Sequence, residues 1–159
     1  MSTPIENRDL TKQAPHSPHE RFGDYAILSR TVDKCRANIA GKLGEYHYDC
    51  PLDNQLFSFK GINGEQFTTI VKSAKNYEDV VASLEKTGTK KSADDIEAWS
   101  DKMDTLKAKD IPSMKDPEHR KFLDESCETL GLDVENVTLF DWLDADDLAS
   151  FEHEHLTEK

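Results

Sequence analysis

The stretch that decides the fold is Tyr25-Ala-Ile-Leu-Ser-Arg-Thr-Val-Asp-Lys-Cys-Arg-Ala-Asn-Ile-Ala-Gly-Lys-Leu-Gly44. Its apolar side chains recur at spacings of four, three and four, at Leu28, Val32, Cys35 and Ile39. That spacing is typical of a helix with one buried face, and the charged side chains of the stretch fall off this face. Glycines at its end stop the pattern. The stretch therefore predicts a helix over Ala26–Lys42 at the centre of the core.

Further helices are predicted on the C-terminal side of this one, each by a cap or a stop together with apolar periodicity. The predicted helices start at or near Pro51, Asn63, Tyr77, Ser92, Pro117 and Thr138. Asn and Asp at caps, Pro in first turns and Gly at ends are the usual boundary residues of helices. About six to seven helices with short connections predict an all-α fold.

The chain of 159 residues is long enough for one domain of ordinary size. Residues 1–19 carry three prolines and few apolar side chains, which predicts an extended N-terminal arm. Residues 20–151 are predicted to form a single helical domain, with a weak break at 88–92. The acidic segment 152–159 is predicted to be a frayed tail.

The charge balance excludes several classes of protein. The chain has 20 Lys and Arg against 32 Asp and Glu, a formal net charge of −12. Nucleic acids and anionic membranes both bind basic surfaces, so neither is an expected partner. The sequence contains no run of 18 apolar residues, so no membrane span is predicted. The N-terminus lacks the apolar stretch of a signal peptide. Together with three unpaired-looking cysteines, these features predict a cytoplasmic protein.

Several motifs resemble those of one protein family. They lie at residues 9–15, 17–23, 28–37, 40–47, 50–53, 96–99 and 140–144. Over residues 9–151 the chain resembles the bacterial domain-of-unknown-function family 5069. The resemblance implies a small bacterial cytoplasmic protein and carries over no activity. His16 and His19 stand where this family tends to have arginine.

The segment Glu45–Asp53 holds the first candidate site, made of Glu45, His47, Cys50 and Asp53. Imidazole and thiol groups are the components of nucleophilic sites, and the same four side chains are also metal-ligand types. A surface-anchoring loop with packed tyrosines is the alternative without a ligand. All three interpretations stay open at this point, although the cysteine spacing matches no zinc pattern and no metal is expected.

Arg30, Lys34 and Arg36 form the second candidate site, because guanidinium and ammonium groups bind carboxylates and phosphates. The alternative is a solvated or internally paired polar helix face. If the helix 26–42 and the segment 45–53 fold together, both sets converge on one cleft that would take a small anionic ligand.

No recognised catalytic motif occurs in the sequence, and it points to no particular cofactor. His16 and His19 are three residues apart, but Pro18 between them makes poor geometry for a metal. The sequence therefore favours a non-catalytic interaction or regulatory module with a protein partner. A small anionic-ligand-binding protein or enzyme is the alternative, and monomer and homodimer are equally open.

Overall fold

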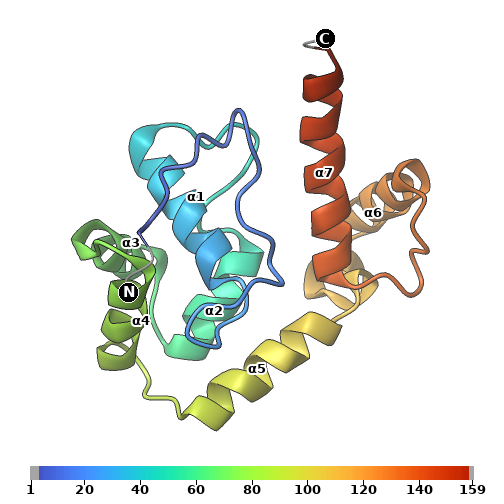
Figure 1. Ribbon diagram of the computed structural model, residues 1–159. Coiled ribbons are helices and arrows are strands. Elements are labelled where there is room, and N and C mark those ends of the chain that lie inside the picture. Colours follow the sequence, from blue (N-terminus) through green and yellow to red (C-terminus); the bar gives the residue numbers. More distant parts are fainter. Residues whose placement is uncertain (1–3, 158–159) are drawn as a thin grey trace. The chain divides into compact units, whose positions relative to one another are not determined.

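The computed structural model describes residues 4–157, and it is all-α as predicted (Figure 1). Its α-helices are α1 (Leu28–Ala40), α2 (Pro51–Lys60), α3 (Gly64–Ser73), α4 (Tyr77–Lys86), α5 (Ala93–Thr105), α6 (Pro117–Leu130) and α7 (Leu139–Thr157). Two short 3₁₀ turns, Ala108–Asp110 and Pro112–Lys115, precede α6. The described part of the chain contains isolated β-bridges but no strand.

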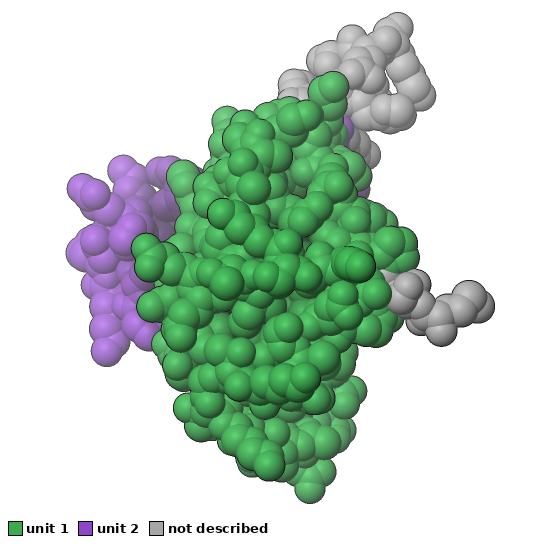
Figure 2. All heavy atoms as spheres, turned by 90° about the vertical axis from the view of Figure 1, so that its left-hand side faces the viewer, with its two compact units in different colours: residues 1–99 green, residues 100–159 purple. Residues whose placement is uncertain are grey.

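The chain divides into two compact units, residues 1–99 and 100–159, coloured separately in Figure 2. The division falls inside α5. The loop 88–92, where a weak break was predicted, lies within the first unit. Helix α7 runs on to Thr157, into the segment predicted as a tail, and residues 158 and 159 lie outside the described part.

Helix α1 is shorter than the predicted 26–42 because of the backbone just before it. Ile27 has a φ of 61°, a left-handed conformation that a helix cannot contain, so α1 begins at Leu28. Gly41, also left-handed, ends the helix. From Pro4 to Ile27 the chain forms turns and isolated β-bridges but no helix. In one of these turns the Glu20 N–H donates to the Ser17 carbonyl.

Polar side chains are buried along α1, which the apolar pattern did not reveal. Nine of its 13 residues are buried, and five of those nine are polar: Ser29, Arg30, Thr31, Asp33 and Lys34. Conversely Ile39, predicted to face the core, is 46% exposed, since the whole last turn from Asn38 to Ala40 is exposed. The helix therefore leaves the core before its sequence pattern ends.

In the first unit, α3 contacts α1, α2 and α4, and the N-terminal arm loops around α1 (Figure 1). The Leu10 N–H donates to the carbonyl of Lys42, just beyond the C-terminal end of α1. Caps fix the helix starts: Asn63 and Gln66 form a capping box at α3, and Asn76 caps α4. Arm and helices thus enclose α1 together.

The second unit has a small core of its own, made of Ala108, Leu123 and Cys127. Trp142 packs against it and donates its indole N–H to Ser126 Oγ at 2.8 Å. Asp116 caps α6 and Gly131 ends it, as the sequence predicts. Within the described residues, no helix combines the length and the apolar character that crossing a bilayer requires.

Candidate functional site

Three of the predicted site residues meet between α1 and α2. Lys34 Nζ lies 2.8 Å from Asp53 Oδ1 and 3.3 Å from Cys50 Sγ. Asp53 is fully buried, and its carboxylate also accepts hydrogen bonds from Thr31 Oγ1 at 3.1 Å and the Asp49 N–H at 3.0 Å. We call Thr31, Lys34, Cys50 and Asp53 the Asp53 cluster. Its polar groups satisfy one another, which is typical of a structural ion pair.

The other predicted residues lie elsewhere. Arg30 donates to the His16 carbonyl at 3.3 Å, and its guanidinium lies 5.7 Å from the ring centroid of Tyr46. Arg36 donates to Asn7 Oδ1, and both Glu45 and His47 are exposed. The seven predicted residues therefore do not line one cleft.

A second buried carboxylate, Asp33 of α1, gathers residues from the arm and from α4. Tyr77 OH donates to Asp33 Oδ1 at 3.1 Å. The other oxygen, Oδ2, accepts the His16 backbone N–H at 2.8 Å and lies 2.5 Å from His16 Nδ1. Arg8 Nε is 4.0 Å from the same oxygen. We call Arg8, His16, Asp33 and Tyr77 the Asp33 cluster.

Asp33 contributes to raised pKa values of two neighbours, His16 and Tyr77. Its hydrogen bond to the imidazole raises the pKa of His16 above the ordinary value, although burial opposes this shift. Burial, and then the charge of Asp33, raise the pKa of the Tyr77 hydroxyl, which therefore stays a donor. The second imidazole nitrogen, Nε2, lies 3.2 Å from Arg8 Nη2 and 3.7 Å from Glu20 Oε2. A neutral His16 accepts from Arg8 there, and a protonated one donates toward Glu20.

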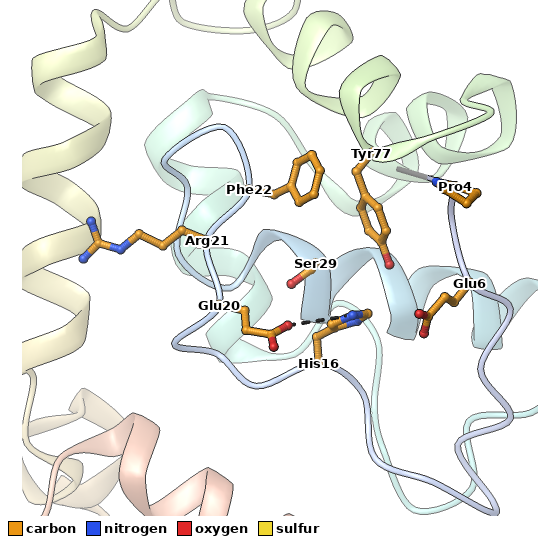
Figure 3. A pocket seen from close by; sticks show the side chains of 8 residues that line it. All are labelled: Pro4, Glu6, His16, Glu20, Arg21, Phe22, Ser29 and Tyr77. Carbon is orange, nitrogen blue, oxygen red and sulfur yellow. Dashed lines mark ion pairs between the residues drawn. The ribbon is translucent and has the colours of Figure 1, made fainter. Parts of the chain in front are cut away.

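A pocket of about 320 Å³ opens beside this cluster (Figure 3). It is lined by Pro4, Glu6, His16, Glu20, Arg21, Phe22, Ser29 and Tyr77. Figure 3 shows the Ser29 side chain projecting from α1 among those of Phe22, His16 and Glu20, whereas the Arg21 guanidinium extends away from them. Ser29 is only 4% exposed, and its Oγ has no hydrogen-bond partner among the described residues.

Sequence reasoning missed Asp33, Ser29 and Tyr77 as site residues, and it treated His16 only as a poor metal ligand. One sequence feature pointed to them. The helix with the best core pattern also carries four charged residues within seven positions, from Arg30 to Arg36. A central helix has little room for solvated charges, so such charges need buried partners.

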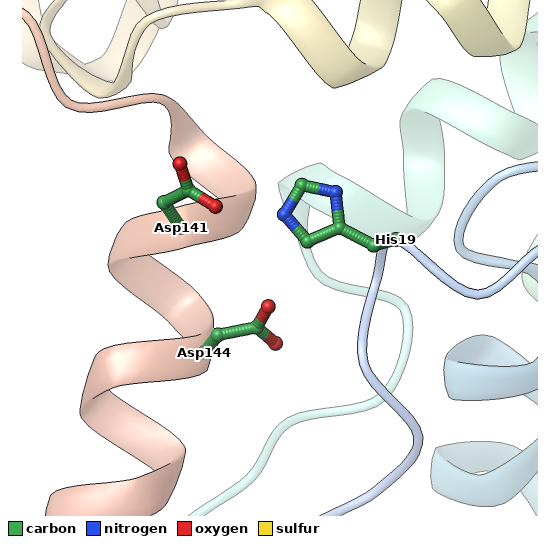
Figure 4. Close-up of side chains that lie close together, drawn as sticks. All are labelled: His19, Asp141 and Asp144. Carbon is green, nitrogen blue, oxygen red and sulfur yellow. The ribbon is translucent and has the colours of Figure 1, made fainter.

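Asp141 and Asp144 lie one turn apart on α7, with both carboxylates on the same side of the helix (Figure 4). His19, drawn with them, belongs to the arm of the other unit. Clustered acidic side chains on a surface are common without an ion, and we assign no metal site to these three residues.

The chain belongs to the family described as a domain of unknown function, DUF5069, whose model matches residues 12–149. This match confirms the resemblance noted in the sequence. No curated protein matches the chain.

Proposed function

We propose that the first unit binds a small molecule in the pocket between the arm, α1 and the start of α4. Its volume of about 320 Å³ is in the range of natural small-ligand sites. Such sites combine apolar or aromatic walls with a few polar groups. Here Phe22 and Tyr77 supply the aromatic wall, and His16 and Ser29 supply polar groups.

The buried hydroxyl of Ser29 is the observation that carries this proposal. An unsatisfied buried polar group costs about 1–3 kcal/mol, and native structures contain few of them. A ligand that hydrogen-bonds to Ser29 Oγ would remove that cost. The hydroxyl thus fits a site that is completed by its ligand.

Binding, and not turnover, is the activity that this arrangement supports. A carboxylate that holds one imidazole nitrogen is also the geometry that prepares a histidine to accept a proton. In this chain, however, His16 Nε2 already has Arg8 and Glu20 as neighbours. A substrate proton would have to displace them first.

The proposed pocket differs from the ligand site that the sequence predicted between residues 26–42 and 45–53. Lys34, Cys50 and Asp53 of that predicted site are engaged with one another in the Asp53 cluster. The proposed pocket instead uses residues of the arm, residues 20–22 after it, Ser29 at the start of α1 and Tyr77 of α4.

Chemical-shift mapping by NMR on the full chain tests the proposal. The probes are benzylamine, benzyl alcohol, benzoate, glycerol and glycine, each added separately. We expect at least one of them to shift the backbone amide signals of Phe22, Ser29 and Tyr77. If none of the five shifts these signals, the pocket is not a ligand site and the proposal is wrong.

A variant that fills the pocket provides the second half of this test. Ser29→Leu places a bulky side chain at the pocket wall and should abolish the shifts. Ser58→Leu makes the same change at an exposed position of α2 and should leave them intact. Far-UV circular dichroism shows whether each variant is folded. Shifts that survive in a folded Ser29→Leu protein would place the binding elsewhere and contradict the proposal.

The interaction or regulatory module predicted from the sequence is our second proposal. Its support lies in the second unit, where Phe122 of α6 and Leu148 of α7 are 62% and 66% exposed. Large exposed apolar side chains are the ones that gain most from a protein partner. Sedimentation velocity over a range of concentrations tests self-association. Association that is lost in Phe122→Ser would support this role, and a strict monomer would exclude a second copy as the partner.

A cytoplasmic location is also proposed. All three cysteines are free thiols, which suits a reducing compartment. Cell fractionation against cytoplasmic and periplasmic marker proteins tests this location.

A further inference from the structure

We propose that the ligand of this pocket is a small organic cation of the amine class; this inference rests on the proposed ligand-binding function. Two carboxylates, an aromatic wall and a buried hydroxyl acceptor surround the pocket. An ammonium group can use all three: charge attraction to carboxylates, the negative faces of aromatic rings, and hydrogen bonds to oxygen.

The carboxylates are those of Glu6 in the arm and of Glu20 just after the arm. Figure 3 shows both side chains on the rim of the pocket, on either side of His16. Their side chains are 55% and 59% exposed; Glu6 accepts from Arg8 Nε at 2.7 Å, and Glu20 Oε2 lies 3.7 Å from His16 Nε2. A carboxylate has about four lone-pair sites on its two oxygens, so both groups keep acceptor sites for an ammonium ligand beside these partners.

The aromatic wall consists of Phe22 and Tyr77, whose ring centroids lie 4.9 Å apart at an interplanar angle of 33°. The two rings thus form one continuous apolar surface. The hydrocarbon part of an amine can lie against it, while the ammonium group reaches the carboxylates. Ser29 Oγ, buried in the wall, offers lone pairs to an N–H donor.

The nearby cations are committed to groups other than the pocket. Arg8 donates to Glu6 at 2.7 Å and to the Ala14 carbonyl at 2.9 Å. The imidazole of His16 is held by the carboxylate of Asp33, and the Arg21 guanidinium extends away from the pocket (Figure 3). An anionic ligand would therefore meet two carboxylates, beside cationic groups that already pair with Glu6, Glu20 and Asp33.

Three matched probes test the charge preference: benzylamine, benzyl alcohol and benzoate share a benzene ring and differ in the charge of the polar group. Dissociation constants come from NMR titrations that follow the amide signals of Ser29 and Tyr77. We expect benzylamine to bind at least about tenfold more tightly than the other two probes, as for one charge-assisted hydrogen bond.

Two variants assign the preference to the pocket. Glu20→Gln removes one rim charge and should weaken benzylamine roughly tenfold, with little effect on benzyl alcohol. Glu97→Gln makes the same change on the exposed face of α5 and should leave all three dissociation constants unchanged. An equal effect of both variants would overturn the role of the rim carboxylates, and with it the cation inference.

The outcomes separate this inference from the function on which it rests. If benzyl alcohol or benzoate shifts the same signals as tightly as benzylamine, the pocket is a ligand site but not one for cations. If none of the three probes shifts them, while glycerol or glycine does, the amine class is also wrong. If none of the five shifts them, the proposed function and the inference fall together.

Discussion

Asp33 of α1 and Asp53 of α2 are both fully buried carboxylates, yet their surroundings differ. Asp53 faces the ammonium group of Lys34 and accepts from Thr31 and one backbone N–H. Asp33 faces an imidazole and a phenol, and Arg8 Nε lies 4.0 Å from its Oδ2. Histidine is the side chain whose charge ordinarily changes near neutral pH. The Asp53 cluster is thus a structural ion pair, whereas the Asp33 cluster contains a histidine whose charge can change and borders a pocket.

The largest effect is expected when the carboxylate of the Asp53 cluster is removed. Asp53→Ala leaves the buried ammonium group of Lys34 without its partner, so we expect a loss of about 3–5 kcal/mol in the free energy of unfolding. Urea denaturation measures it. The double variant Lys34→Met/Asp53→Leu removes both charges and should recover most of the loss. A single-variant loss below about 1 kcal/mol would mean that the cluster is not a tight ion pair.

Asp33→Asn should cost less than Asp53→Ala, about 1–3 kcal/mol, because its amide oxygen can still accept from Tyr77 and the His16 imidazole can lose its proton. Urea denaturation under the same conditions gives the comparison. The substitution also removes the main cause that raises the pKa of His16, so that pKa should fall. NMR titration of the imidazole signals measures the fall. An unchanged His16 pKa would contradict the importance of this pair.

The pH dependence of the free energy of unfolding should report on His16 of the Asp33 cluster. The folded-state pKa of His16 lies above its unfolded value of about 6.5, so its stabilising contribution is complete below about pH 6.5. The contribution is lost as the pH rises through the folded-state pKa. The free energy of unfolding should therefore decline over this window in the natural chain and decline less in His16→Gln. Parallel pH profiles for the two proteins would show that the pair is not linked to folding.

The smallest effect is expected at the pocket itself, and it has the opposite sign. Ser29→Ala removes a buried hydroxyl that has no partner among the described residues, so the free protein should gain about 1 kcal/mol. Thermal unfolding without ligand measures the gain, and Ser58→Ala at an exposed site of α2 is the control. A loss of stability in Ser29→Ala alone would indicate that the hydroxyl already has a structural role.

The fold was predictable because its helix boundaries depend on local chemistry. The reciprocal bonds between Ser92 and Asp95, and the stop at Gly131, involve neighbours in sequence. Boundaries failed where the backbone took a conformation unusual for its residue, as at Ile27. An isoleucine gives no hint of a left-handed φ, which glycine or asparagine would have suggested.

The site was largely unpredictable for a different reason. Apolar periodicity reveals which helix face is buried by apolar side chains, but not which polar residues are buried with them. Asp33 pairs with His16, 17 residues earlier, and with Tyr77, 44 residues later. No local pattern links such distant positions. The Lys34–Asp53 ion pair connects the helix 26–42 with the segment 45–53. Arg30 and Arg36 of the same predicted set instead bond to the arm residues His16 and Asn7.

The span of the Asp33 cluster has a consequence for synthesis on the ribosome. Arg8, His16 and Asp33 are translated well before Tyr77, the last member of the cluster. A nascent chain that already contains α1 therefore holds a carboxylate without its phenol donor, and a pocket without one wall. Because chains emerge from the ribosome with the N-terminus first, the arm cannot complete the Asp33 cluster until Tyr77 of α4 has emerged. During that interval the arm and α1 are exposed to proteases and chaperones.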